Sequence, residues 1–191
     1  RSRIEKIELI LKFNNEFTIS EPLSLLVSKF LRLSLIIVHS TPLDVISSDL
    51  KIRFPELATV SWTSQEIESA DHCGFISPEY FSLDQKFFIE SQGFNSCLNK
   101  KVSIDSDGSI KHCPAMNNSF GKISEIKLAD VLKNEAFRKI WKVNKDQIET
   151  CQDCEFRYIC SDCRAFLRNG DNMYPKPLKC NYDPYSGVWI E

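Results

Sequence analysis

Cysteine is the residue type with the greatest capacity for chemistry in this sequence, which contains eight of them in a grouped arrangement. Four follow the pattern C-x2-C-x5-C-x2-C: Cys151, Cys154, Cys160 and Cys163. A C-x2-C step lets the backbone curl so that two thiolates point at one centre, which predicts a metal site. Cys97 and Cys113 flank a predicted hairpin whose closure would bring their thiols together. With Cys73 and Cys180, the eight thiols divide into two four-cysteine sites.

The spacing also bears on the identity of the metal. Zinc is often bound by four cysteines, and thiolate ligands alone do not separate zinc from an iron–sulfur cluster. Zinc ribbons leave roughly a dozen or more residues between their knuckles, whereas five residues separate Cys154 from Cys160. That crowding is relieved if Cys163 leaves its local group and joins the other site. The pattern therefore favours iron–sulfur clusters, with structural zinc as the alternative.

Composition and charge narrow the class of protein. At 191 residues and 42% hydrophobic, the chain can bury a core without disulfides. Lys and Arg total 24 against 26 Asp and Glu, a net charge of −2, so neither nucleic acid nor an anionic membrane is an expected partner. Residues 1–13 lack the features of a signal peptide, and no apolar run reaches the ~18 residues of a membrane span. We expect a cytoplasmic protein, in which grouped thiols bind metal more often than they form disulfides.

The first 70 residues have the pattern of an α/β fold. Residues 7–13 form an apolar run of strand length. Ser20 is a predicted N-cap for a helix that starts at Glu21 and has apolar residues at helical spacing from Leu23 to Leu31. A second apolar strand over 35–38 follows, and Val60 belongs to a third. A helical crossover of this length predicts parallel strands. Because the chain has no initial Met and enters a buried strand almost at once, we expect it to be the C-terminal part of a longer protein.

The composition changes near residue 70, where the cysteine-rich part begins. We therefore predict two domains, residues 1–70 and 71–191. In the second domain, strand residues around Asp105-Ser106-Asp107-Gly108 predict a hairpin, since Gly tolerates positive φ in the turn. Apolar residues at helical spacing predict a helix over 128–143 with a break near Asn134.

The seven cysteines from Cys97 to Cys180 resemble the SPASM domain. Its pattern is C-x9–15-G-x4-C, then C-x2-C-x5-C-x3-C, then a last C; the one departure is that two residues, not three, separate Cys160 from Cys163. The resemblance covers roughly residues 71–191 and implies an α+β domain with a hairpin and short helices. Such domains follow the partial (β/α) barrel of radical SAM enzymes that modify peptides, so residues 1–70 would be the end of that barrel.

Three segments are similar, more narrowly, to the maturases of grasp-with-spasm systems: ESQGFNSCLNKKVSID, CQDCEFRYICSDCRAF and KPLKCNYDPYSGVW. Those maturases act on a ribosomally made precursor peptide (RiPP biosynthesis) together with an ATP-grasp ligase. The resemblance implies two auxiliary [4Fe–4S] clusters. It assigns the first to Cys97, Cys113 and Cys163, with Cys73 as the available fourth ligand, and the second to Cys151, Cys154, Cys160 and Cys180.

The catalytic motif of radical SAM enzymes, C-x3-C-x2-C, does not occur in this sequence. A cofactor role for S-adenosylmethionine therefore requires an upstream half. Pro114 stands where sulfatase-maturing relatives have a catalytic Asp, so no catalytic residue is assigned. The first hypothesis is the iron–sulfur part of a peptide-modifying enzyme. The alternatives are a non-catalytic, cluster-stapled module that presents a peptide to a ligase, and a structural zinc protein.

Several other residues have a functional and a structural interpretation, and the structural one is expected for each. His72 and His112 each adjoin a cysteine but stand singly. Asp105 and Asp107 are expected to bond to the backbone in a turn rather than act as an acid pair. The remaining side chains, expected to pack rather than to bind nucleic acid or substrate, are Arg157, Tyr158, Arg164, Phe166, Trp141, Trp189 and Tyr185.

Overall fold

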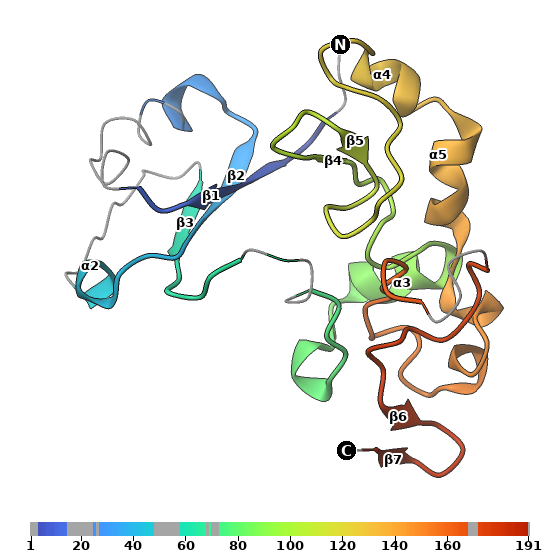
Figure 1. Cartoon of the computed structure of the whole chain (residues 1–191). Helices are drawn as coiled ribbons and strands as arrows, with labels where there is room; N and C mark the ends of the chain where they lie inside the picture. Colours follow the sequence, from blue (N-terminus) through green and yellow to red (C-terminus); the bar gives the residue numbers. More distant parts are fainter. Residues whose placement is uncertain are drawn as a thin grey trace. The chain divides into compact units, whose positions relative to one another are not determined.

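The structure is a computed structural model that describes residues 4–14, 25, 27–47, 58–67, 69, 73–167 and 172–190. The chain separates into two compact units, Arg1–Ser69 and Ala70–Glu191 (Figure 1). Among the described residues, no helix has the length and apolar character needed to cross a membrane.

The first unit is built on a parallel sheet of three strands in the order β1-β2-β3 (Figure 1). The strands are β1 (Ile7–Lys12), β2 (Leu33–His39) and β3 (Thr59–Trp62), and both neighbouring pairs run parallel. The predicted α/β fold with parallel strands is thus confirmed, and β2 begins two residues before the expected range. The described part of this unit does not show a barrel, which stays a prediction.

The core of the first unit lies against the central strand. Leu33, Ile36 and Val38 of β2 are buried together with Val27, as expected for a strand covered on both faces. Residues 25 and 27–29 are helical, but the predicted N-cap Ser20 lies outside the described residues. A short helix that the sequence did not predict, α2 (Leu43–Ser47), follows β2. Five residues are too few to show a helical apolar period.

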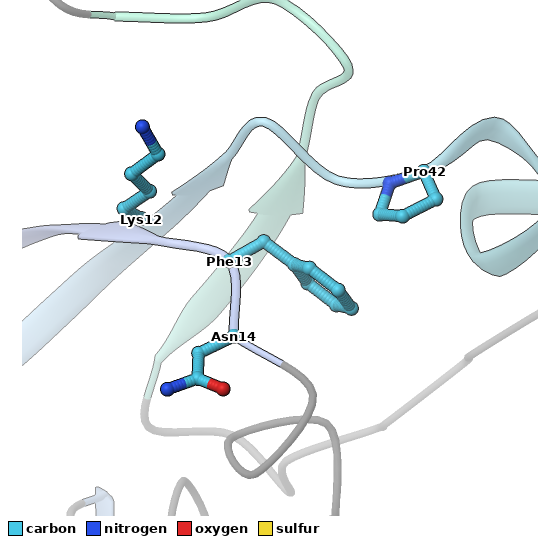
Figure 2. A pocket seen from close by; sticks show the side chains of 4 residues that line it. All are labelled: Lys12, Phe13, Asn14 and Pro42. Atoms are coloured by element: carbon cyan, nitrogen blue, oxygen red, sulfur yellow. The ribbon is translucent and has the colours of Figure 1, made fainter.

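A pocket of about 620 Å³ opens at the carboxyl end of β1 and is lined by Lys12, Phe13, Asn14 and Pro42. Figure 2 shows the Phe13 ring reaching toward the segment that carries Pro42, while Lys12 points the other way. The Lys12 ammonium lies 3.2 Å from the Glu66 carboxylate. No cysteine lines this pocket, so it is separate from the chemistry considered below.

The second unit consists of short elements joined by ordered turns. In chain order they are η3 (Pro78–Tyr80), α3 (Gln85–Gly93), β4 (Ser103–Ile104), β5 (Ile110–Lys111), α4 (Leu128–Val131), α5 (Glu135–Lys139), η4 (Ile140–Lys142), η5 (Lys145–Gln147), η6 (Cys151–Asp153), β6 (Tyr182–Asp183) and β7 (Val188–Trp189), where η marks a 3₁₀ helix. The helix α3 was not predicted from apolar spacing because Ser91 is its one buried residue. Its N-cap, Asp84, accepts a hydrogen bond from the Phe87 amide, as N-cap carboxylates do.

The predicted hairpin is present as the antiparallel pair β4 and β5. Gly108 has φ +81° in the turn. The Asp107 carboxylate accepts from the Ser109 amide at 2.9 Å, and Asp105 lies 2.6 Å from the Lys111 ammonium. The Asp107 side chain therefore bonds to the backbone of the turn as expected, whereas the Asp105 side chain forms an ion pair with Lys111 across the hairpin.

The helix predicted over 128–143 is interrupted where the sequence indicated. Helix α4 ends at Val131, and Asn134 then caps α5 by accepting from the Ala136 amide at 2.8 Å. Phe137 of α5 is fully buried and packs with Ile110 of the hairpin. This apolar cluster anchors the hairpin, and with it the segment leading to Cys113.

Candidate metal centre

The structure brings four cysteines from separate segments of the second unit into one group, which we call the first group: Cys73, Cys97, Cys113 and Cys163. Burial raises the pKa of the Cys97 thiol to about 11, and nearby charge on the other three thiols of the group adds to the rise, although Lys101 lowers it. The Cys113 thiol is likewise within electrostatic range of Cys73 and Cys163. Cys113 and Cys163 are thus both within electrostatic range of Cys97.

Two backbone features position members of the first group. The Asn95 side-chain oxygen accepts from the amides of Cys97 at 3.0 Å and Leu98 at 2.8 Å, which fixes the turn that presents Cys97. Gly74 has φ +80°, and a Cβ on it would lie 3.0 Å from the Cys163 sulfur. A side chain at position 74, directly after Cys73, would therefore crowd the Cys163 sulfur.

We expect Gly74→Ala to destabilise the second unit by about 1–2 kcal/mol, because its left-handed backbone is costly for any residue with a Cβ. The contact with the Cys163 sulfur should also weaken metal retention by the first group. Gly93→Ala is the matched control, since a Cβ there would meet nothing within 4 Å. Anaerobic urea unfolding of both variants checks this expectation, and equal midpoints would contradict it.

The remaining four cysteines, which we call the second group, line a single pocket: Cys151, Cys154, Cys160 and Cys180. The free space between them is small, about 20 Å³. Apolar and aromatic side chains complete the lining: Ile76, Phe81, Phe156, Tyr182 and Trp189. The four thiols therefore share one pocket, in surroundings that exclude much of the solvent.

The backbone beside the second group is strained at one point. Thr150, immediately before Cys151, has φ +66°, which is a rare conformation for a β-branched residue. Such strain costs on the order of 1–3 kcal/mol and is found preferentially at functional sites. Here it turns the chain into η6, whose first residue is Cys151 and whose C-cap is Cys154.

A buried polar network links the two groups. Asp162 lies between Cys160 and Cys163 in the sequence and is fully buried. Its carboxylate accepts from the Arg164 guanidinium at 2.6 Å and from the Asn95 amide at 2.7 Å. Because Asn95 also holds the turn of Cys97, a single carboxylate connects the segments that carry ligand candidates of both groups.

Lys145 approaches the second group from η5. Its side chain is buried, and its ammonium donates to the Cys160 sulfur at 3.1 Å. Burial alone would lower the pKa of Lys145, but the nearby charges of Cys160 and Asp162 outweigh it and raise that pKa. Lys145, Asp162 and Asn95 were not among the predicted site residues. Their burial depends on contacts between distant segments, and the one local signal is the place of Asp162 inside a C-x2-C step.

Burial disfavours the thiolate form of five of the eight thiols, which is the opposite of what a nucleophilic cysteine needs. It is the main cause that raises the pKa of these five: Cys97, Cys113, Cys151, Cys154 and Cys160, with Cys151 at about 12. Because ligands must lose their protons, metal affinity at such thiols falls as the pH falls. All eight cysteines are free of disulfides.

Apart from Tyr185, the other residues considered from the sequence pack as the structural interpretation expected. His112 stacks on Phe137 at 4.3 Å, and its Nε2–H donates to the Phe137 carbonyl at 2.7 Å, while His72 lies outside the described residues. The Arg157 guanidinium lies 4.4 Å from the centroid of the Tyr158 ring. Further packing residues are Trp141 against Phe137, Phe166 under the Lys179 ammonium, and Trp189 against Tyr182. Tyr185 differs from the expectation, because it is 72% exposed and its hydroxyl donates to the Asp153 carboxylate at 2.8 Å.

Part of this unit matches a known protein family. Residues 96–155 match the SPASM family, an iron-sulfur cluster-binding domain. This segment is a SPASM domain. The match spans the hairpin and the first C-x2-C step, so it includes Cys97 and Cys113 of the first group and Cys151 and Cys154 of the second. Searches of curated proteins and of solved structures gave no match.

The SPASM match indicates iron–sulfur cluster binding for the segment 96–155. Among the described residues, no three or more His, Cys, Asp or Glu side chains converge as the ligands of a single metal ion do. The assignment of individual cysteines to individual clusters stays a prediction, which the next section develops.

Proposed function

We propose that the chain binds two [4Fe–4S] clusters and forms the iron–sulfur part of a maturase that modifies a ribosomally made precursor peptide. The first group would hold one cluster and the second group the other. The observation that carries the proposal is the division of eight thiols into two groups of four in a unit that contains a SPASM domain. Four cysteine thiolates are the usual ligand set of a [4Fe–4S] cluster.

The residues around the second group fit such a cofactor. Four sulfur donors line one pocket, and the rest of the lining is mostly aromatic and aliphatic. Apolar surroundings limit the access of water and oxygen to bound iron. The Lys145 ammonium donates a hydrogen bond to the Cys160 sulfur. Its positive charge stabilises a thiolate at this position more than a neutral thiol.

The first group fits the cofactor for a different reason. Its members come from four separate segments of the chain rather than from one C-x2-C step. The Lys179 ammonium donates to the Cys73 carbonyl at 2.7 Å, and Lys179 immediately precedes Cys180 of the second group. Cys73, inferred from the family only as the available fourth ligand, is therefore tied to the rest of the centre.

A cluster supplies one-electron transfer when it is bound. The chain's own residues would hold its sulfur ligands, exclude water through Phe81, Phe156 and Trp189, and balance charge through Lys145. Radical chemistry itself requires the C-x3-C-x2-C motif, which this sequence does not contain. S-adenosylmethionine is therefore proposed only for an enzyme in which a further segment supplies that motif, and no catalytic residue is proposed.

Metal analysis tests the cofactor part of the proposal. Anaerobic purification of the chain should give brown protein with about eight iron and eight sulfide per chain, since each [4Fe–4S] cluster holds four of each. Colourless protein with about two zinc ions per chain would instead identify two structural zinc sites. Aerobic purification is the matched control, because oxygen should bleach the clusters while leaving zinc in place.

Co-expression tests the substrate and partner. The chain in its native reading frame is expressed with a precursor peptide and an ATP-grasp ligase from the same gene cluster, and the mass of the peptide is measured. A mass change that requires this chain supports a maturase. Peptide that is bound but unchanged in mass would favour the non-catalytic module that presents a peptide to the ligase.

A further inference from the structure

Lys145 is a buried cation directed at a candidate cluster ligand. Its side chain is 5% exposed, and lysine is almost never so buried without a partner. The sole side-chain partner of its ammonium among the described contacts is the Cys160 sulfur, at 3.1 Å. Burying an ammonium costs several kcal/mol, so the structure retains this charge beside the second group despite a substantial desolvation penalty.

The charges around Lys145 do not cancel it. Asp162 is the nearest buried acid, but its carboxylate is paired with the Arg164 guanidinium at 2.6 Å. Lys145 and Arg164 carry two positive charges against the one negative charge of Asp162, which leaves +1 beside the second group. Glu155, which also lies near Cys154, is exposed and accepts from the Tyr182 hydroxyl.

The cations near the first group are placed differently from Lys145: Lys179 is only partly buried, and its ammonium donates to the Cys73 backbone carbonyl at 2.7 Å. The cation within range of Cys97 is Lys101, whose side chain is exposed. Water and salt screen an exposed charge far more strongly than a buried one. The two groups therefore share the same four-thiol composition but differ in the electrostatic field that acts on it.

The reduction potential of an iron–sulfur cluster rises with positive charge and with hydrogen bonds to its sulfurs, and it depends on solvent exposure. We propose that Lys145 is a positioning residue that raises the reduction potential at the second group, which makes this the more easily reduced of the two sites. The proposal rests on the proposed function, because it requires that both groups bind clusters. It assigns a different redox role to each group.

Lys145→Met tests the proposal, because Met has nearly the same length and no charge. The full chain is purified anaerobically and titrated with dithionite while both midpoints are followed by electron paramagnetic resonance. The higher midpoint should move to a more negative potential, and the lower one should stay where it is. Iron and sulfide content should match the wild type.

Two controls and a second variant complete the experiment. Lys142→Met removes an exposed lysine three positions away, and Lys101→Met removes the exposed lysine near the first group; neither should move a midpoint appreciably. Lys145→Gln retains a hydrogen-bond donor without the charge. It should give a shift of the same sign as Lys145→Met but smaller.

The outcomes separate this inference from the proposed function. Wild-type protein without iron refutes the proposed function as well. Wild-type protein with both clusters, combined with unmoved midpoints in Lys145→Met, an equal shift of both, or a shift of the lower one alone, overturns only the role of Lys145. Loss of iron from both Lys145 variants would also overturn it, since Lys145 would then serve to assemble the site.

Discussion

Cys154→Ala is expected to remove one whole cluster and most of the cooperative structure of the second unit. Cys154 lines the pocket of the second group and ends η6, so three thiols would remain for a cofactor that uses four. In small metal-stapled modules, metal binding and folding are one equilibrium, worth on the order of 10 kcal/mol for structural zinc. We expect iron to fall by about half or more, with loss of near-ultraviolet circular dichroism.

The matched control for this experiment is Gln152→Ala. Gln152 lies in the same C-x2-C step, but its side chain is exposed, so iron content and unfolding midpoint should stay at wild-type values. Full iron content in Cys154→Ala would show that the grouping of ligands proposed here is wrong. An equal loss of iron in Cys154→Ala and Gln152→Ala would show that any substitution in this C-x2-C step lowers iron content, whether or not the residue is a metal ligand.

The cysteine spacing was informative because metal ligands must meet in space, and only a few chain paths bring four of them together. The crowding of five residues between Cys154 and Cys160 indicated that Cys163 leaves its local group, and in the structure Cys163 lies within electrostatic range of Cys97. In the first unit, uninterrupted apolar runs such as 35–38 predicted buried parallel strands correctly. These patterns are local in sequence, and tertiary contacts do not override the structures that they predict.

The polar support of the centre could not be predicted in the same way. Lys145 and Asp162 belong to residue types that are usually exposed, and apart from the place of Asp162 inside a C-x2-C step, nothing nearby in the sequence distinguishes them from surface charges. Their burial follows from contacts between segments far apart, such as the bond from Asn95 to Asp162. The short 3₁₀ helices also escaped prediction, because three residues cannot show a period.

Asp162→Ala is expected to destabilise the second unit by about 3–5 kcal/mol, the usual effect of removing one partner of a buried ion pair. Arg164 is 3% exposed, and within the described part of the chain its guanidinium would retain its bonds to the carbonyls of Met173 and Pro175 alone. The Asn95 amide would lose its bond of 2.7 Å to the same carboxylate. Urea unfolding of the anaerobically purified chain measures this loss.

The comparison variants make the prediction specific to the buried pair. Asp146→Ala removes a half-exposed carboxylate that lies 3.1 Å from Arg157, and exposed pairs of this kind contribute roughly 0–1 kcal/mol. Asp162→Asn should also destabilise, because Asn95 cannot reverse its amide without giving up the bonds it accepts from Cys97 and Leu98. Two amide NH2 groups would then face each other in the core.

Because Asp162 joins the segments of both groups, Asp162→Ala should lower the iron content of both groups. Loss of iron from the second group alone would show that the two sites are held independently.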